Sequence, residues 1–257
     1  MPNDLMVPAS TLIAFLLVLA RVSGVVAFVP IPGLRNGPLA ARVVLVLALA
    51  MMLLPSAPVL AGHLPAIGEL LVWSASEAAF GLTIGLALSF WLEGFQLAGQ
   101  AIGLQAGYSY ASTIDPNTQA DSSVLVLMAQ LLAGLLFFSL GFEREITKIL
   151  AKSLVRFPPG SYKIDGPIAL AVVSLGKEIF REGLRLALPV IALLLLIDLA
   201  LGMLSRVQTQ LQLLTLAFPV KMLVAILVLT SSLVLFPSVF ARSSSHVLST
   251  LLRLASH

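Results

Sequence analysis

The longest uncharged apolar runs constrain what this chain can fold into more than any other feature. Residues 43–62 and 122–142 contain no Asp, Glu, Lys or Arg. A helix needs about 20 apolar residues to cross the hydrocarbon core of a bilayer, and both runs reach that length. The whole chain is 59% hydrophobic and 11% charged, with a mean hydropathy of +1.04, whereas soluble domains contain roughly 25% charged residues. The sequence therefore predicts a membrane protein.

Six apolar segments, most of them separated by Pro, Gly or charged residues, are predicted to be helices: 11–30, 40–61, 67–92, 122–142, 184–204 and 214–240. At about 20 residues per span, a chain of this length holds about six crossings and no separate soluble domain. We therefore expect an all-α, polytopic, hydrophobic protein that forms a single module over residues 1–257. We predict no signal peptide, because no basic residue precedes the first segment and no Ala-x-Ala-like cleavage site ends it.

Four charged residues lie within these segments and more than three residues from their ends: Arg21, Glu77, Asp198 and Lys221. A charge at the centre of a lipid-facing helix costs about 2.5–3.5 kcal/mol on insertion scales, so these side chains should face protein or water. For Arg21 and Glu77, snorkelling from a span end and burial in an interface both stay open. Asp198 and Lys221 lie near mid-depth, which favours pairing inside an assembly. A proton relay is disfavoured, because it needs several ionisable groups in line.

Segment 94–123 combines a ridge of small residues with a polar stretch. Gly99, Gly103 and Gly107 recur every four residues, so a helix would carry them as one bare ridge against which another backbone can pack. The spacing does not distinguish a contact within the chain from a contact between subunits. After the ridge, the polar composition and the turn-forming Asp115-Pro116 pair interrupt the apolar pattern. Composition alone favours an exposed loop here over backbone that lines water or protein.

The positive charge of the chain is concentrated in the connecting region 143–185. This region holds eight of the fifteen Lys and Arg residues and five of the twelve Asp and Glu residues, so it carries the whole net charge of +3. Arg144, Lys148, Lys152 and Arg156 form a basic stripe on a predicted helix over 143–157. The apolar face of this helix consists of residues at helical spacing: Ile146, Ile149, Leu150, Leu154 and Phe157. A position near anionic lipid headgroups is the favoured interpretation, and a docking face for a protein partner is the alternative. Residues 241–257 are predicted to form an amphipathic tail helix.

The sequence lacks the residue patterns that would indicate catalysis, a cofactor or a metal site. The chain has no cysteine, and its three histidines, at positions 63, 246 and 257, are far apart in the sequence. No phosphate-binding loop, dinucleotide fingerprint or nucleophile elbow occurs. Basic residues are few and are not interleaved with aromatic ones, which argues against nucleic-acid binding. We therefore predict neither an enzyme nor a cofactor or metal site.

The run from Glu93 to Pro116 resembles the central signature of the FliR family of flagellar type III export-gate proteins. It contains the glycine ridge and ends in Tyr-Ser-Tyr-Ala-Ser-Thr-Ile-Asp-Pro. Later residues, including Asp198, Arg206 and the Phe218-Pro219 pair, resemble the family's distal block. One departure is that relatives usually have a Pro-Gln pair soon after the arginine, where this chain reads Val-Gln-Thr-Gln.

This resemblance implies helical hairpins packed into a hetero-oligomeric export gate in the bacterial inner membrane, at the base of the flagellum. FliP and FliQ subunits would complete the gate, FlhB would attach to it, and unfolded flagellar proteins would pass through it without a catalysed reaction. Membrane lipids would surround it, although much of the assembly would extend beyond the bilayer. The resemblance also changes the interpretation of the polar stretch, which becomes a pore plug made of Tyr108, Tyr110, Ser112, Thr113, Asp115, Pro116 and Asn117.

Five charged residues are expected to be buried or to lie in an interface: Arg21, Glu77, Asp198, Arg206 and Lys221. The nearest alternative is the corresponding gate subunit of a virulence injectisome. A secondary transporter could use Arg21, Asp198 and Lys221 as ion or substrate sites, but the inverted repeat typical of such proteins is not visible. An intramembrane enzyme would need a convergent catalytic set, which the sequence lacks.

Overall fold

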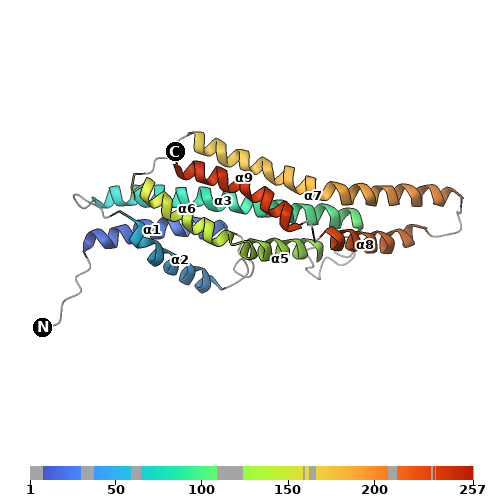
Figure 1. Cartoon of the computed structure of the whole chain (residues 1–257), viewed down its shortest axis with the longest axis horizontal. Helices are drawn as coiled ribbons and strands as arrows, with labels where there is room; N and C mark the ends of the chain where they lie inside the picture. The colour runs from blue at the N-terminus through green and yellow to red at the C-terminus, as the bar shows by residue number, and fades with distance from the viewer. Residues whose placement is uncertain are drawn as a thin grey trace. The chain divides into compact units, whose positions relative to one another are not determined.

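The computed structural model describes residues 8–29, 38–58, 65–108, 124–158, 160–161, 166–207, 213–232, 234 and 236–256. Within these ranges every regular element is a helix and no strand occurs (Figure 1). The elements are α1 (Ala9–Phe28), α2 (Leu39–Leu53), the short 3₁₀ helix η1 (Leu54–Ser56), α3 (Ile67–Ala106), α5 (Val124–Ser139), α6 (Phe142–Arg156), α7 (Gly166–Val207), α8 (Leu213–Ser232) and α9 (Phe236–Ser256). The predicted all-α class is confirmed.

The helices form two compact units, each described here by itself. Unit 1 contains Met1–Ser89, Phe137–Gly176 and Ser245–His257, and unit 2 contains Phe90–Leu136 and Lys177–Ser244. The helices α3, α5, α7 and α9 each contribute residues to both units. That residues 1–257 act as a single module stays a prediction.

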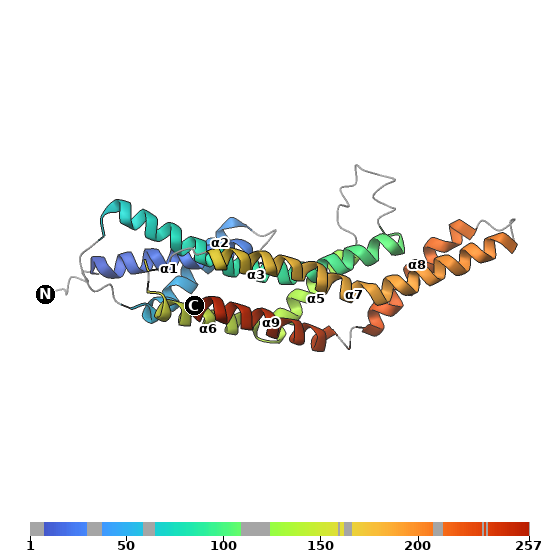
Figure 2. The same cartoon turned by 90° about the horizontal axis from the view of Figure 1, so that it is seen from above.

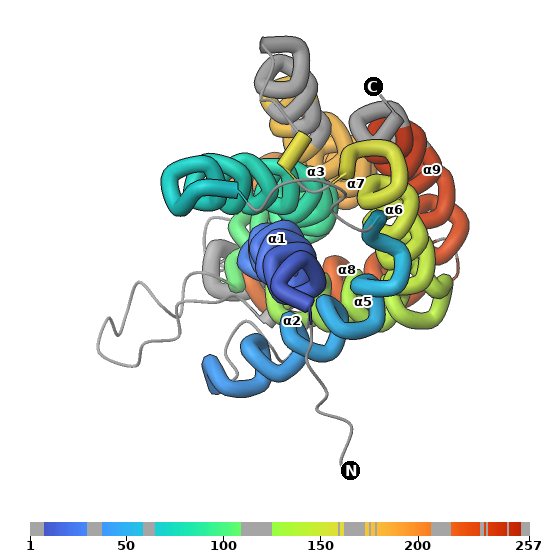
Figure 3. The backbone as a smooth tube through the Cα atoms, turned by 90° about the vertical axis from the view of Figure 1, so that its left-hand side faces the viewer, coloured from blue at the N-terminus to red at the C-terminus, as the bar shows by residue number. Residues whose placement is uncertain are grey.

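In unit 1, glycines let α1 and the first part of α3 approach closely. Gly81 of α3 lies against the backbone of Arg21 and Gly24 of α1, and Gly24 in turn lies 2.8 Å, measured from the position of an added Cβ, from the amide nitrogen of Leu82. Small residues at helix crossings allow this backbone contact. Figures 2 and 3 show α1 along the first part of α3, and α2 packs against the other side of α1.

Helix α6 is amphipathic and packs into unit 1 through its apolar face. Its buried residues Ile146, Ile149, Leu150 and Leu154 recur at helical spacing, as predicted for 143–157, and its basic residues lie on the outside. The turn before α6 contains Gly141 with a φ of 72°, a left-handed conformation that glycine adopts without strain. The other end of α6 packs against η1.

In unit 2, the second part of α3 packs with α5, α7 and α8. The buried cluster consists of Ala98, Ile102, Ala106, Leu125, Ala187, Val190, Leu194 and Ala225. Close approach of α3 and α7 depends on Gly183, where an added Cβ would lie 2.9 Å from the carbonyl oxygen of Gly94. Trp91 and Phe95 of α3 pack against Phe240 of α9, with ring centroids 4.5 and 5.1 Å from that ring. Helix α8 runs beside the later part of α7 (Figures 1 and 2).

Several predicted boundaries were wrong. Segments 67–92 and 94–123 do not belong to separate helices, because α3 continues unbroken through Gly94 to Ala106; one glycine inside a helix costs only about 1 kcal/mol. Segment 184–204 lies within the longer α7, which contains Pro189. Segment 40–61 ends early, because Pro55 tightens the chain into η1. Segment 214–240 is divided between α8 and α9.

The described helices are long and apolar enough to cross a membrane at several places. Four helices meet this criterion alone, and up to six spans result if each bent pair of helices is counted as one. The prediction of about six crossings matches the upper count. Only 17% of the apolar window of α7 and 11% of that of α2 are buried within the chain. These helices must therefore be covered by lipid or by other subunits.

The glycine contact between α1 and α3 generates a stability prediction. Gly81→Ala would push a methyl group into the α1 backbone at Arg21, and overpacking of this kind costs about 1–3 kcal/mol. Gly68→Ala is the matched control on the same helix, because nothing lies within 4 Å of its Cβ position. We expect thermal unfolding of the purified protein in mild detergent to occur at a lower temperature for Gly81→Ala and at an unchanged or higher one for Gly68→Ala. Equal melting temperatures for both variants would show that the contact is not close.

Candidate functional site

The end of α3 is built to turn the chain sharply. Gly107 has a φ of 90°, and the amide of Tyr108 donates a hydrogen bond to the carbonyl oxygen of Gly103 at 2.9 Å. The Gly107 amide donates to the carbonyl of Leu104 at 3.2 Å, which completes a Schellman cap. The ring of Phe218 occupies the space next to Gly107, 2.6 Å from the position where a Cβ would be. Glycine is therefore required here both for its conformation and for the space it leaves.

Tyr108 fixes the first residue after this turn. Its hydroxyl donates a hydrogen bond to the carbonyl oxygen of Met222 on α8 at 3.2 Å, and its ring packs against the core of unit 2. Burial raises the pKa of the Tyr108 phenol, because desolvation disfavours the phenolate. The side chain therefore remains a neutral donor.

Beside this turn, α3, α7 and α8 contribute one polar group each to a shared hydrogen-bonded set. Asp198 of α7 accepts hydrogen bonds from Lys221 Nζ and from Gln105 Nε2, each at 3.0 Å to Oδ2. The second carboxylate oxygen of Asp198 lies 2.9 Å from Lys221 Nζ. The Lys221 side chain is 11% exposed and that of Asp198 is 38% exposed. The two charges therefore neutralise each other in a pair that the chain only partly encloses.

We refer to these residues together as the α3-end cluster: Gln105, Gly107, Tyr108, Asp198, Phe218 and Lys221. They hold in place the residue from which the polar stretch departs. The other residues assigned to the pore plug lie outside the described part of the chain: Tyr110, Ser112, Thr113, Asp115, Pro116 and Asn117.

A second polar set is fully buried in unit 1. Arg21 of α1 and Glu77 of α3 form an ion pair with 2.5 Å between Nε and Oε2, and their side chains are 1% and 0% exposed. The guanidinium also donates to Ser153 Oγ at 3.1 Å and to the carbonyl oxygen of Phe157 at 3.0 Å. The other oxygen of Glu77 accepts a hydrogen bond from the amide of Gly160 at 2.9 Å.

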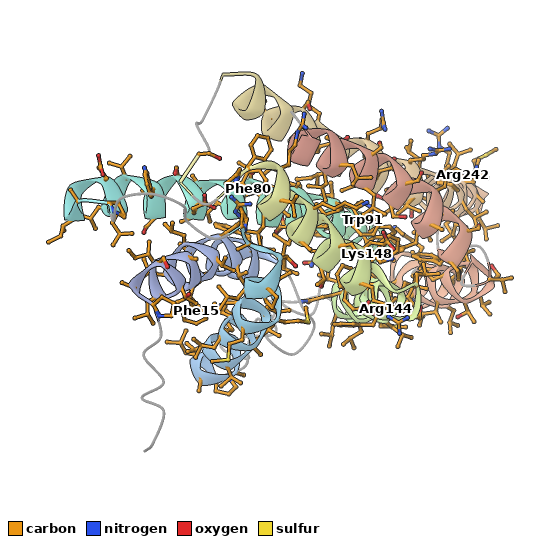
Figure 4. All side chains as sticks on the ribbon, turned by 60° about the vertical axis from the view of Figure 1, so that its left-hand side comes forward. Phe15, Phe80, Trp91, Arg144, Lys148 and Arg242 are labelled. Carbon is orange, nitrogen blue, oxygen red and sulfur yellow. The ribbon has the colours of Figure 1, made fainter. Side chains whose placement is uncertain are left out.

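An aromatic residue completes this arrangement. The Arg21 guanidinium lies over the ring of Phe80, 4.8 Å from its centroid. Figure 4 shows Phe80 on α3 near α6, and its ring centroid lies 6.0 Å from that of Phe157. The ion pair thus connects α1, α3 and α6, and both of its charges have hydrogen-bonding partners, as buried charges require.

The remaining predicted residues have different surroundings. Gly99 of the ridge packs against α5 of the same chain, where an added Cβ would lie 2.9 Å from both Leu125 O and Ala129 Cβ. Gly103 is buried. Arg206 is exposed in the last turn of α7, where a positive charge interacts favourably with the helix dipole.

Sequence reasoning missed several participants. Gln105 and Phe218 belong to the α3-end cluster, and Ser153 and Gly160 complete the buried ion pair. Gln105 carried a usable signal, because it is a polar residue among apolar ones on the glycine-ridge helix. Phe218 was noted only as part of the family's distal block, and Ser153 and Gly160 have no signal in a single sequence.

Chemically, the described residues offer paired charges and packing surfaces. Among them, no group of three or more His, Cys, Asp or Glu residues is arranged to hold a metal ion. Together, the apolar helices, the close glycine contacts and the internally paired charges define a polytopic helical membrane protein.

Comparison with known proteins narrows this class. The sequence model described as "Bacterial export proteins, family 1" matches residues 12–247. The chain is 32% identical to the flagellar biosynthetic protein FliR of Escherichia coli over 209 residues, which cover 81% of this chain and 79% of that protein. It is 28% identical to the protein of the same name from Bacillus subtilis over 222 residues, covering 84% of each chain. The chain therefore belongs to the FliR family of bacterial export proteins.

The buried ion pair gives a second stability prediction. Glu77→Met leaves the Arg21 guanidinium buried without its carboxylate partner, and breaking a buried pair from one side costs about 3–5 kcal/mol. We expect the double variant Arg21→Met/Glu77→Met to be more stable than either single variant, because no unpaired charge remains. Lys221→Met should be milder, because Asp198 is only partly enclosed by the chain and keeps the hydrogen bond from Gln105. Thermal unfolding of the four variants measures these differences, and additive losses in the double variant would contradict the pairing.

Proposed function

We propose that this protein is a structural, pore-forming subunit of the flagellar type III secretion export gate. In this role it passes unfolded flagellar proteins across the inner membrane at the base of the flagellum and helps to plug the closed channel. Family membership and the flagellar names of its relatives support the flagellar role over the injectisome alternative.

The observation that carries the plug assignment is the anchored end of α3. A Schellman cap, a tyrosine hydrogen bond and the Phe218 contact fix the point at which the polar stretch begins. Irregular polar backbone among apolar helices is tolerated only against protein or water. A rigid base would allow the stretch to return to one closed position after each passage.

The apolar surface that the isolated chain leaves exposed supports the proposal that it has protein partners. Large apolar side chains of α7 that are exposed in the isolated chain include Leu184, Leu188, Leu195, Leu196, Leu199 and Met203. We infer that FliP and FliQ subunits cover surfaces of this kind in a hetero-oligomer, and that FlhB attaches to the assembled gate. No catalytic step is required, since transport through such a gate is driven by other components.

The charged residues favour this role over a secondary transporter. A transporter site at Arg21 would need an accessible guanidinium, but its side chain is 1% exposed and is already bonded to Glu77 and Ser153. Asp198 and Lys221 are likewise paired with each other. Such closed pairs stabilise helix packing.

Removing part of the proposed plug tests the function directly. Deletion of Ser112–Asn117 should leave the complex assembled but leaky to small ions, because the obstruction is lost while the α3-end cluster is intact. Ion permeability is measured in cells that express the flagellar genes, after copurification has shown unchanged assembly.

The control variant for this experiment is Gly68→Ala, which lies outside the α3-end cluster at the start of α3. Nothing lies within 4 Å of its added Cβ, so it should preserve a tight membrane. A tight membrane in the deletion strain would overturn the plug assignment, whereas family membership would stand.

The requirement for partners gives a separate prediction. Expressed alone, the chain should accumulate poorly or aggregate, because its apolar helix faces lack cover. Coexpression with FliP and FliQ should increase the yield of monodisperse protein in size-exclusion chromatography. A stable, monodisperse monomer in the absence of both would contradict an obligate-subunit role.

A further inference from the structure

A surface hollow in unit 1 lies where α6 meets η1. It has a volume of about 520 Å³ and is lined by Ser56, Ala151, Lys152, Val155 and Arg156. Neither the buried ion pair nor the α3-end cluster includes any of these residues. The hollow therefore needs its own explanation.

Two cations on the rim have no carboxylate partner among the described residues. Lys152 and Arg156 are exposed and four residues apart, so they share one face of α6. Within the described ranges, neither forms an ion pair, whereas Lys148 on the same helix lies 2.7 Å from Glu145 and Arg144 lies 3.7 Å from Glu143. The positive charge at the hollow is thus locally uncompensated.

The hollow also contains a hydroxyl group and an apolar surface. The Ser56 hydroxyl has no hydrogen-bond partner among the residues that the structure describes. Val155, which lies between the two cations in the sequence, is 68% exposed. Such a set of donors above a small apolar patch suits a phosphate group attached to a hydrocarbon chain.

The position along α2 identifies the source of that phosphate. The apolar stretch Leu39–Ser56 is long enough to cross a membrane and is only 11% buried within the chain. Its side chains Val44, Leu47 and Met51 are exposed on the way to η1. The hollow therefore lies at the end of an apolar stretch that the chain leaves uncovered, where a lipid tail and its headgroup can lie together.

We propose that this hollow binds the headgroup phosphate of an anionic glycerophospholipid. Lys152 and Arg156 hold the phosphate oxygens, and the Ser56 hydroxyl donates to one of them. One acyl chain lies along the exposed face of α2. The proposal does not depend on the gate function, since it rests on unit 1 alone.

The test uses the protein purified from its native membrane together with the proteins that accompany it. The complex is reconstituted in nanodiscs of phosphatidylcholine with a minor fraction of phosphatidylglycerol. After a detergent wash, the lipids retained by the complex are quantified by mass spectrometry. A photo-cross-linking amino acid at position 155 reports what occupies the hollow.

The matched variants differ only in the position of the lost charges. Lys152→Gln/Arg156→Gln removes two positive charges at the hollow, and Arg144→Gln/Lys148→Gln removes two elsewhere on α6, where Figure 4 labels both residues. At the hollow we expect retained phosphatidylglycerol to fall by roughly tenfold or more, because each basic residue near an anionic surface contributes about 1 kcal/mol. The control variant should retain nearly as much as the wild type. The variant Lys152→Arg/Arg156→Lys keeps both charges and should also retain phosphatidylglycerol.

Three results would overturn the proposal. Equal losses in the hollow and control variants would indicate general attraction to an anionic surface. Equal retention of both lipids by the wild type would show that no anionic headgroup is selected. Cross-links from position 155 to protein alone would show that another subunit covers the hollow; this readout needs no charge variant, so it decides the matter even if the double variant fails to assemble.

Discussion

The pairing of Arg21 with Glu77 is the constraint around which unit 1 is arranged. A buried guanidinium is tolerated only if its charge and its N–H groups find partners, and these come from α3, from α6 and from the turn that follows α6. The ion pair can form only because Gly24 and Gly81 let α1 and α3 approach each other. The crossing of α1 and α3, the ion pair and the position of α6 therefore depend on one another. A change in one of them disturbs the other two.

The ion pair of the α3-end cluster differs from the buried pair in its exposure. Asp198 is more than a third exposed within the chain and also accepts a hydrogen bond from Gln105, so it keeps a donor when Lys221 is lost, whereas Glu77 is fully enclosed. Separation of the Asp198–Lys221 pair is correspondingly less costly than separation of the buried pair. The chain thus combines a fully enclosed ion pair in unit 1 with a partly exposed one at the end of α3.

Much of the fold could be predicted from the sequence, because helix formation in an apolar chain depends on local composition. The helix of 143–157 and its buried face followed from the spacing of Ile146, Ile149 and Leu154. The continuity of α3 through Gly94 could not be predicted, because a glycine that breaks an exposed helix is tolerated where α7 packs on it. The partners of Arg21 are 56 to 136 residues away in the sequence, and no local pattern connects residues at such distances. The Gln105 contact with Asp198 was hidden for the same reason.

The unbroken length of α3 has a geometric consequence. At 1.5 Å per residue, a helix of 40 residues is about 60 Å long, twice the roughly 30 Å thickness of the hydrocarbon core. Tilting alone cannot contain it, since a tilt near 60° would be needed and transmembrane helices rarely exceed about 40°. Part of α3 must therefore stand in the aqueous phase or among other proteins, even though its composition is that of a membrane span. The hydropathy of this helix therefore indicates how much of its surface is covered by lipid or protein. It does not indicate the depth of the helix in the bilayer.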